Sequence, residues 1–169
     1  MTVQFGIRRL YPEDGAFLRS MLREAAYWHP DIARPPMSDM LADNSLSRYV
    51  EDWGRHGDLG LIAISEAGRS VGAAWLRLFQ EDRPGYGFID GSTPEMSIAV
   101  EPELRGRGIG SGLIRALLNK SQQAGFQSVS LSVSAQNPAL HLYERCGFQR
   151  LSLTDGSWLM RYWLPCASV

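Results

Sequence analysis

A glycine-rich turn at residues 105–112, R-G-R-G-I-G-S-G, carries residue types suited to binding an anion. Glycine allows positive φ angles and lets the backbone approach a ligand closely. The first amides of a helix have no partner within that helix, and the helix dipole makes this end positive. Two guanidinium groups favour a ligand with more than one negative charge. The turn therefore predicts a site for a phosphate ligand such as a pyrophosphate.

Two common nucleotide motifs do not fit this turn. A P-loop needs G-x-x-x-x-G-K-[ST], and no lysine stands near the turn. The dinucleotide fingerprint G-x-G-x-x-G fails because its third glycine would fall on Ser111, Leu113 or Arg115. The alternative is a glycine-rich connection with solvated arginines, although four alternate glycines destabilise a chain unless its backbone approaches something closely.

The turn is expected to join a strand to a helix. Residues 96–100 form an apolar run that predicts a strand ending before Pro102. Apolar residues at helical spacing predict an amphipathic helix after the turn, and Gly125 is a suitable stop. These apolar residues are Leu113, Ile114, Leu117 and Leu118.

A second strand and helix are expected to follow. Residues 126–134 alternate between serines and the apolar residues Val129, Leu131 and Val133, which predicts a strand. Asn137 and Pro138 are typical of a helix start, and this helix is expected to run through Cys146.

The remaining elements are expected on both sides of this central region. A helix should start at residues 12–14, an irregular stretch should span residues 27–37, and one or two short helices should lie within residues 38–53. Further strands are expected at residues 4–9, 59–65, 70–79, 148–153 and 158–164.

The composition narrows the class of protein. The chain has 169 residues, with 17 lysines and arginines against 18 acidic residues, so its net charge is −1. This balance argues against a strongly basic nucleic-acid binder. No apolar run approaches the ~18 residues of a membrane span, and no histidine or cysteine cluster has metal-ligand spacing. We expect a single cytoplasmic domain over residues 1–169, with no nucleic-acid or membrane partner and no metal.

Three segments together resemble a known family. Residues 105–110 match R/Q-x-x-G-x-G/A, the acyl-CoA pyrophosphate loop of the GCN5-related N-acetyltransferases (GNAT). The match extends upstream to E-M-S-I-A-V-E-P-E-L and downstream to N-P-A-L-H-L-Y-E-R-C-G-F, and covers about residues 95–148. The resemblance implies a GNAT fold of the α/β class, with a mixed, mostly antiparallel seven-stranded sheet and helices on both faces.

The resemblance also implies how acetyl-CoA would bind. Backbone groups of Ile98, Ala99 and Val100 would bind the pantetheine arm as an added strand does. Asn137 would contact the cofactor, with a plain N-cap as an equal alternative. The pyrophosphate would be held by Arg105, Gly106, Arg107, Gly108, Ile109, Gly110 and Ser111.

Two catalytic residues are implied in the same way. Tyr143 matches the tyrosine beside the thioester. Full proton transfer from a tyrosine to a thiolate is uphill by ~1.5 pKa units, so hydrogen bonding to the departing thiolate is the better expectation. Glu95 matches an acidic residue that acts as a base. The alternatives are core packing for Tyr143 and a solvated strand end for Glu95. Arg77 and Arg161 are expected to be solvated charges.

The implied reaction is transfer of an acetyl group from acetyl-CoA to a primary amine by direct attack. It needs neither a metal nor a covalent intermediate, because no cysteine or serine with a partnered base is visible. The implied acceptor is a small-molecule or peptide amine, and a homodimer is left open as an alternative to a monomer. One alternative is a non-catalytic acyl-CoA-binding regulatory module, and another is transfer of a longer acyl chain. Tyr27, Trp28 and Trp53 either line an acceptor pocket or pack in the core.

Overall fold

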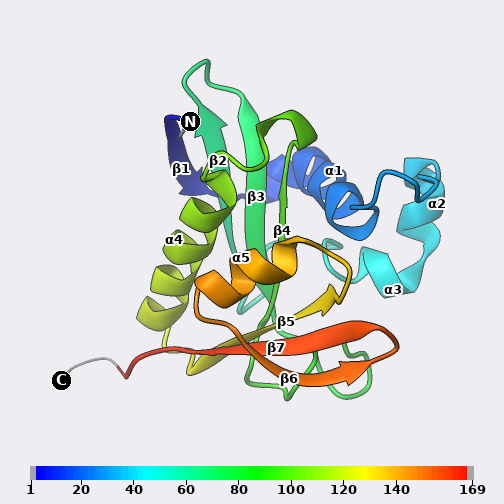
Figure 1. The fold of residues 1–169 in the computed structure, drawn as a ribbon, viewed down its shortest axis with the longest axis vertical. Helices are drawn as coiled ribbons and strands as arrows, with labels where there is room; N and C mark the ends of the chain where they lie inside the picture. The colour runs from blue at the N-terminus through cyan, green and yellow to red at the C-terminus, as the bar shows by residue number, and fades with distance from the viewer. Residues whose placement is uncertain (1–2, 167–169) are drawn as a thin grey trace.

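The protein is built on one seven-stranded sheet, in a computed structural model that describes residues 3–166 (Figure 1). The strand order is β1-β2-β3-β4-β5-β7-β6. Every neighbouring pair is antiparallel except β4 and β5, which are parallel. The strands are β1 (Phe5–Arg9), β2 (Leu59–Ser65), β3 (Ser70–Arg77), β4 (Glu95–Val100), β5 (Ser128–Ser134), β6 (Gln149–Thr154) and β7 (Ser157–Trp163). The predicted fold class is confirmed.

Helices cover both faces of the sheet, as expected. They are α1 (Gly15–Ala26), α2 (Met37–Ala42), α3 (Asn44–Ser47), α4 (Ile109–Gln123) and α5 (Ala139–Arg145), with short 3-10 helices at Pro12–Asp14 and Pro102–Leu104. Helices α4 and α5 lie over one face, and α1 to α3 lie against the other (Figure 1). Within residues 3–166, no helix is both long enough and apolar enough to cross a membrane.

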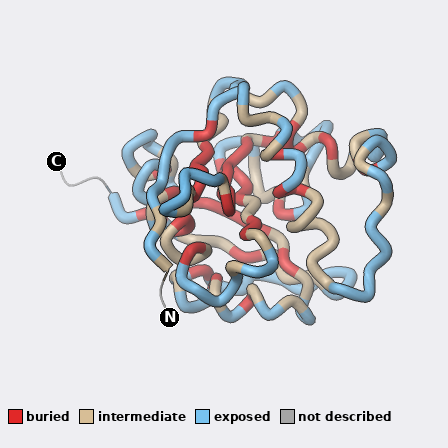
Figure 2. Tube along the Cα trace, turned by 90° about the horizontal axis from the view of Figure 1, so that it is seen from above, coloured by how far each residue is buried: buried red, intermediate tan, exposed pale blue. Residues whose placement is uncertain are grey.

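Each face of the sheet has its own hydrophobic core. The predicted apolar side of α4 is buried, including Leu113, Ile114 and Leu117, and packs with Leu131 of β5. The opposite core joins apolar residues of α1 to α3 with Ala73 and Trp75 of β3. Figure 2 shows the buried segments inside an exposed outer shell. Side chains of successive strand residues alternate between these two cores, as the pleat requires.

The serine side of β5 is covered by the long connection between β3 and β4. Ser128 and Ser130 are buried, and the Ser128 hydroxyl lies 3.3 Å from that of Thr93. A Cβ on Gly87 would lie 2.9 Å from the backbone nitrogen of Ser132, so this connection passes directly against β5. Small polar residues fit here because a chain segment, rather than solvent, lies on this side.

Two arginines are less solvated than the sequence suggests. Arg77 was expected to be a solvated charge, and this prediction is wrong: its side chain and that of Asp58 are each only 2% exposed, and they form an ion pair of 2.8 Å. Arg161 donates to the Ser128 hydroxyl at 3.0 Å and lies over the Trp163 ring at 3.8 Å. Asp58 and Ser128 are distant in sequence from these arginines, so no local pattern could reveal these two contacts.

Candidate functional site

Strands β4 and β5 separate along their length. Glu95 and Ser130 are the single register pair that joins them among the described residues, and the Ser130 amide donates to the Pro94 carbonyl at 3.0 Å. Beyond this pair, β4 continues beside β3 alone. The Glu101 amide bonds to Val71 on the β3 side. Backbone groups alternate in direction along a strand, so those of Ile98 and the Val100 amide face the opening, whereas those of Ala99 face β3.

A run of unpartnered amides lies where β4 leads into α4. Gly106 and Gly108 have positive φ angles of 71° and 90°, which turn the chain into the helix. The first backbone bond of the helix runs from the Gly112 amide to the Gly108 carbonyl at 3.0 Å. Within residues 3–166, none of the amides of residues 106–111 donates a hydrogen bond. These amides stand at the positive end of a 15-residue helix, the arrangement that binds anions.

The four alternate glycines do not share one role. A Cβ on Gly110 would lie 3.2 Å from Leu142 of α5, and one on Gly112 would lie 2.6 Å from the Phe5 ring of β1. These two glycines let α4 pack closely against its neighbours. The turn also contacts the start of the chain, because the Val3 amide donates to the Arg107 carbonyl at 3.4 Å. Only Gly106 and Gly108 serve the conformation of the turn itself.

The two arginines of the turn differ in the same way. Arg105 donates through Nε to the Val100 carbonyl at 3.1 Å and pairs through Nη2 with Glu24 at 3.1 Å. Its guanidinium group therefore fastens the end of β4 to α1. Arg107 is exposed, and its side chain has no hydrogen bond or ion pair among residues 3–166. It is the arginine of the turn that can move toward a bound anion.

One large cleft connects these features. Its volume is about 1350 Å³, and its lining includes β4, the end of β5, the glycine-rich turn and one side of α5. The predicted residues Glu95, Asn137 and Tyr143 all lie along it. Aromatic residues from other parts of the chain complete the wall: Tyr27, Trp28, Tyr49 and Tyr86. Trp53, the third predicted aromatic, packs in the core instead.

Glu95 lies at the point where the strands part. It is 4% exposed, so the alternative of a solvated strand end is wrong. The Tyr49 hydroxyl donates to Oε1 at 2.7 Å, whereas Oε2 is buried with no hydrogen-bond partner in the described structure. Burial raises the pKa of Glu95 to about 7, against smaller lowering effects of Tyr49, the Gly87 amide and Arg48. A carboxyl group of this pKa can accept a proton near neutral pH.

Tyr143 and Asn137 each combine a structural contact with a place in the cleft. The Tyr143 ring packs edge-on against Phe148, with centroids 6.0 Å apart, and burial raises the pKa of its hydroxyl above the usual value. The Asn137 Oδ1 accepts from the Ala139 amide at 2.9 Å, so this side chain binds the first amide of α5 from one position before the N-cap residue Pro138. Burial also raises the pKa of the nearby Cys146 thiol, which disfavours the nucleophilic thiolate.

Sequence reasoning missed Tyr49 and the loop at residues 85–87. Both stand far from the recognised motif, and their relation to Glu95 depends on the folding of the β3–β4 connection. The spacing of Gly85 and Gly87 was the available signal. A Cβ on Gly85 would lie 2.1 Å from Glu95 Oε2, and one on Gly87 would lie 3.0 Å from Glu95 Cδ. These glycines let a loop cover the carboxyl group.

Comparisons with known proteins agree with this geometry. The model of the acetyltransferase (GNAT) family matches residues 23–148. Mycothiol acetyltransferase of Propionibacterium freudenreichii subsp. shermanii is 29% identical over 136 residues, which are 80% of this chain and 40% of that protein. Mycothiol acetyltransferase of Mycobacteroides abscessus is 31% identical over 150 residues, which are 88% of this chain and 46% of that protein. The chain thus spans less than half the length of these curated relatives.

Solved structures show the same fold. Phosphinothricin acetyltransferase of Sinorhizobium meliloti, determined in complex with acetyl-CoA, superposes with a TM-score of 0.69 at 22% identity, over 97% of this chain and 89% of that one. The matched family region contains the splayed strands, the amide run and most of the residues that line the cleft. The resemblance in the sequence is confirmed, and this chain belongs to the GNAT acetyltransferase family.

Proposed function

We propose that the protein is an acetyl-CoA-dependent N-acetyltransferase that moves an acetyl group to a primary amine by direct attack. The observation that carries this proposal is the run of free amides at residues 106–111, placed at the end of a strand that has parted from its neighbour. An anion site and an unpaired strand edge in one cleft suit a ligand that is both diphosphate-bearing and rich in amides. We further propose that residues 3–166, with their single sheet, act as one domain.

The residues present fit acetyl-CoA. The amides of residues 106–111 would hold the pyrophosphate, with Arg107 adding mobile positive charge. Backbone groups of Ile98 and Val100 would bond to the pantetheine arm, and Asn137 would lie beside it. Arg105 supports the site through Val100 and Glu24. When bound, acetyl-CoA supplies the acetyl group as an activated thioester.

Glu95 is the base in this proposal. An alkylamine of pKa ~10.4 is about one part in 2,500 neutral at pH 7, so a nearby proton acceptor lowers a penalty of roughly 4.6 kcal/mol. The carboxyl group of Glu95, with its pKa raised to about 7, is substantially ionised at neutral pH. Its Oε2 atom is buried without a hydrogen-bond partner in the described structure, so it keeps an unused acceptor site for the amine or for a relaying water.

Tyr143 would act on the thioester of acetyl-CoA rather than on the amine. Its ring belongs to the core under α4 and α5, whereas Glu95 shares its side of the sheet with Trp75 and Ala99. The opening between β4 and β5 joins the two sides. The amine would therefore approach from the Glu95 side, and the Tyr143 hydroxyl would donate to the sulfur of the departing thiolate.

The acceptor is proposed to be a small cationic amine. Tyr27, Trp28 and Tyr86 line the cleft, and the faces of aromatic rings attract ammonium groups. The similar proteins carry names that indicate different acceptors. The sequence relatives are mycothiol acetyltransferases, and one protein of similar structure is a spermidine N-acetyltransferase chimera from Vibrio cholerae and hSSAT. In this chain, the aromatic residues of the cleft wall would determine the selectivity among amines.

Binding and turnover test the proposal separately. Isothermal titration should detect binding of CoA, and absence of binding at millimolar concentrations would remove the cofactor assignment. A screen of primary amines with thiol detection should show release of CoA that depends on specific amines. Binding of CoA without amine-dependent release would contradict the enzyme and favour the regulatory module. Acetyl-CoA and longer acyl-CoA donors run side by side would decide the acyl chain.

A further inference from the structure

The Tyr49 hydroxyl group joins the base to the loop that covers it. It donates to Glu95 Oε1 at 2.7 Å and accepts from the Tyr86 amide at 2.7 Å. Tyr49 is 5% exposed and Glu95 is 4% exposed, so water cannot easily replace either bond. A buried hydroxyl with both a donor and an acceptor partner is held in one orientation.

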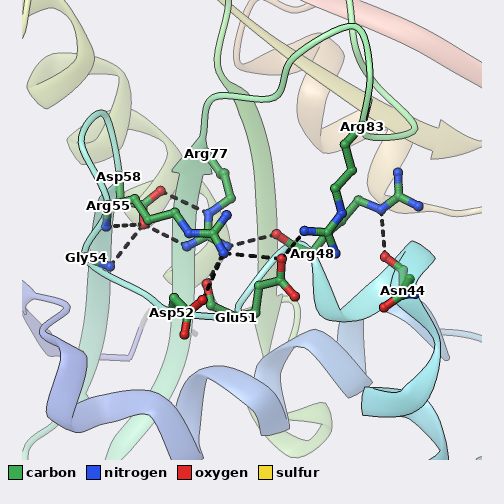
Figure 3. Close-up of polar contacts among 9 residues, drawn as sticks. All are labelled: Asn44, Arg48, Glu51, Asp52, Gly54, Arg55, Asp58, Arg77 and Arg83. Carbon is green, nitrogen blue, oxygen red and sulfur yellow. Dashed lines mark hydrogen bonds and ion pairs between the residues drawn. The ribbon is translucent and has the colours of Figure 1, made fainter.

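The backbone around Tyr49 is held from β3. Trp75 Nε1 donates to the Tyr49 carbonyl at 3.1 Å. Arg77 Nη1 donates to the carbonyls of Arg48 and Glu51 at 2.9 and 2.7 Å, while its other nitrogens bind Asp58 (Figure 3). Residues on both sides of Tyr49 are therefore tied to one buried guanidinium group. This explains a charged residue in the interior of the protein: Arg77 fixes the turn after α3.

The covering loop is fastened to the same turn. Arg48 donates to the Pro84 carbonyl. Arg83 pairs with Glu51 (Figure 3). Gly85 follows these two contacts, and its backbone packs closely against Glu95 and Tyr49. A Cβ on Gly85 would lie 2.1 Å from Glu95 Oε2 and 2.8 Å from the Tyr49 hydroxyl oxygen. The turn after α3, the loop and the carboxyl group of Glu95 thus form one connected unit.

We propose that Tyr49 is a positioning residue for the acetyl transfer: its hydroxyl group orients the Glu95 carboxyl group toward the cleft and ties it to the loop at residues 85–87. The inference rests on the proposed function, in which Glu95 is the base. With Oε1 engaged by Tyr49, Oε2 is the oxygen left for the amine. Tyr49 itself donates nothing to the reactants, because burial and the neighbouring carboxylate raise the pKa of its hydroxyl far above the usual value.

The charged and titratable groups facing Glu95 come from three directions. From the turn after α3 come the Tyr49 hydroxyl and the Arg48 guanidinium, which lower its pKa, and the Gly87 amide of the loop acts in the same direction. On β3, Arg77 stands opposite Glu95 in register, but its charge is paired with Asp58. On β5, the partner is the neutral Ser130. Removing the Tyr49 hydroxyl group therefore removes the main hydrogen bond that stabilises the ionised carboxylate of Glu95.

The test is the substitution Tyr49→Phe, with Tyr11→Phe as the matched control at an exposed ring outside the cleft. The pH at which Glu95 titrates is measured directly by NMR of protein carrying ¹³C-labelled glutamate, with Glu95→Gln identifying the resonance. A lost hydrogen bond to a charged group is expected to raise this pH by about one to two units. The acidic limb of the kcat profile should move with it, while KM for acetyl-CoA stays unchanged.

A second variant should shift the pH at which Glu95 titrates in the opposite direction. Replacing Tyr49 by 3-fluorotyrosine keeps the shape but makes the phenol a stronger donor, so Glu95 should titrate at a lower pH. An unchanged Glu95 titration in folded Tyr49→Phe protein would overturn the inference. If that variant does not fold, the absence of a downward shift with fluorotyrosine overturns it instead. A protein that acetylates no amine would contradict the proposed function, and the NMR titration would still decide whether Tyr49 controls Glu95.

Discussion

Gly106 and Gly125 flank α4 in the same left-handed conformation, with φ angles of 71° and 86°, and a Cβ on either would meet no atom within 4 Å. The two positions are equivalent in backbone strain and differ in their surroundings. Gly106 borders the cleft and the run of free amides, whereas Gly125 follows the other end of the helix. Substitutions at these two glycines therefore distinguish the stability lost by placing a side chain in a left-handed turn from the effect of that side chain on ligand binding.

Alanine at either glycine should cost about 1–2 kcal/mol of stability, because L-residues disfavour the left-handed region. Only Gly106→Ala should also weaken CoA binding, by about tenfold or more, because it alters the turn that aims the amides. Denaturant unfolding and isothermal titration measure the two effects. Equal CoA affinity in both variants would argue that the turn does not bind the pyrophosphate.

Glu95→Gln should lower kcat by about 10²- to 10⁴-fold, the usual contribution of a general base. In the wild type, kcat should rise with pH through about 7, since only the ionised carboxylate accepts a proton. The variant should lack this limb. The exposed Glu66→Gln is the matched control and should keep the wild-type profile. A Glu95→Gln enzyme with normal kcat would show that another group is the base.

The same substitution should stabilise the protein at high pH. The pKa of Glu95 is about 7 when folded against 4.5 for a free glutamate, so the folded state binds more protons between these pH values. Stability due to this group is therefore present below about pH 4.5 and is lost as the pH rises through 7. The difference amounts to about 3 kcal/mol. The Tm of Glu95→Gln should exceed that of wild type at pH 8, and the gap should close toward pH 5; a constant gap would contradict the raised pKa.

Arg107→Gln should raise KM for acetyl-CoA by about tenfold with little change in kcat, because Arg107 has no protein partner among residues 3–166 and is free to meet the anion. The effect should shrink at high salt, which screens an exposed charge. Arg19→Gln, at another exposed arginine, should change nothing. Steady-state kinetics at two ionic strengths provide the measurement, and a salt-independent loss would point to a packing defect instead.

Asp58→Asn should destabilise the protein by about 3–5 kcal/mol, because it leaves the Arg77 charge buried and unpaired. Asp52→Asn is the matched control: its ion pair with Arg55 is at the surface, and its loss should cost less than about 1 kcal/mol. Urea unfolding measures both. Similar midpoints for the two variants would mean that Arg77 does not depend on Asp58.

Much of the fold could be predicted from local patterns. The expected strand at residues 59–65 has the bounds of β2, and the alternation of serine with valine and leucine located β5. The amphipathic side of α4 was visible because its apolar residues fall within one short segment. These elements follow from periodicities that a few neighbouring residues contain.

The candidate site was predicted only where it is local. The glycine-rich turn could be interpreted as an anion site because its amides come from consecutive residues. The burial of Glu95 could not be predicted, because it depends on Tyr49, which stands 46 positions away, and on a loop whose only signal in the sequence is its glycines. Arg77 was misjudged for the same reason. A strand pattern reports which side a residue faces, but not which chain segment lies there.

The contact of Val3 with Arg107 bears on how the protein should be handled in the laboratory. An affinity tag fused ahead of residue 1 would end three positions before the Val3 amide that bonds to the turn. Such a tag could compete with CoA through its own charges. Affinities for CoA are therefore best compared between proteins tagged at the N-terminus and at the C-terminus.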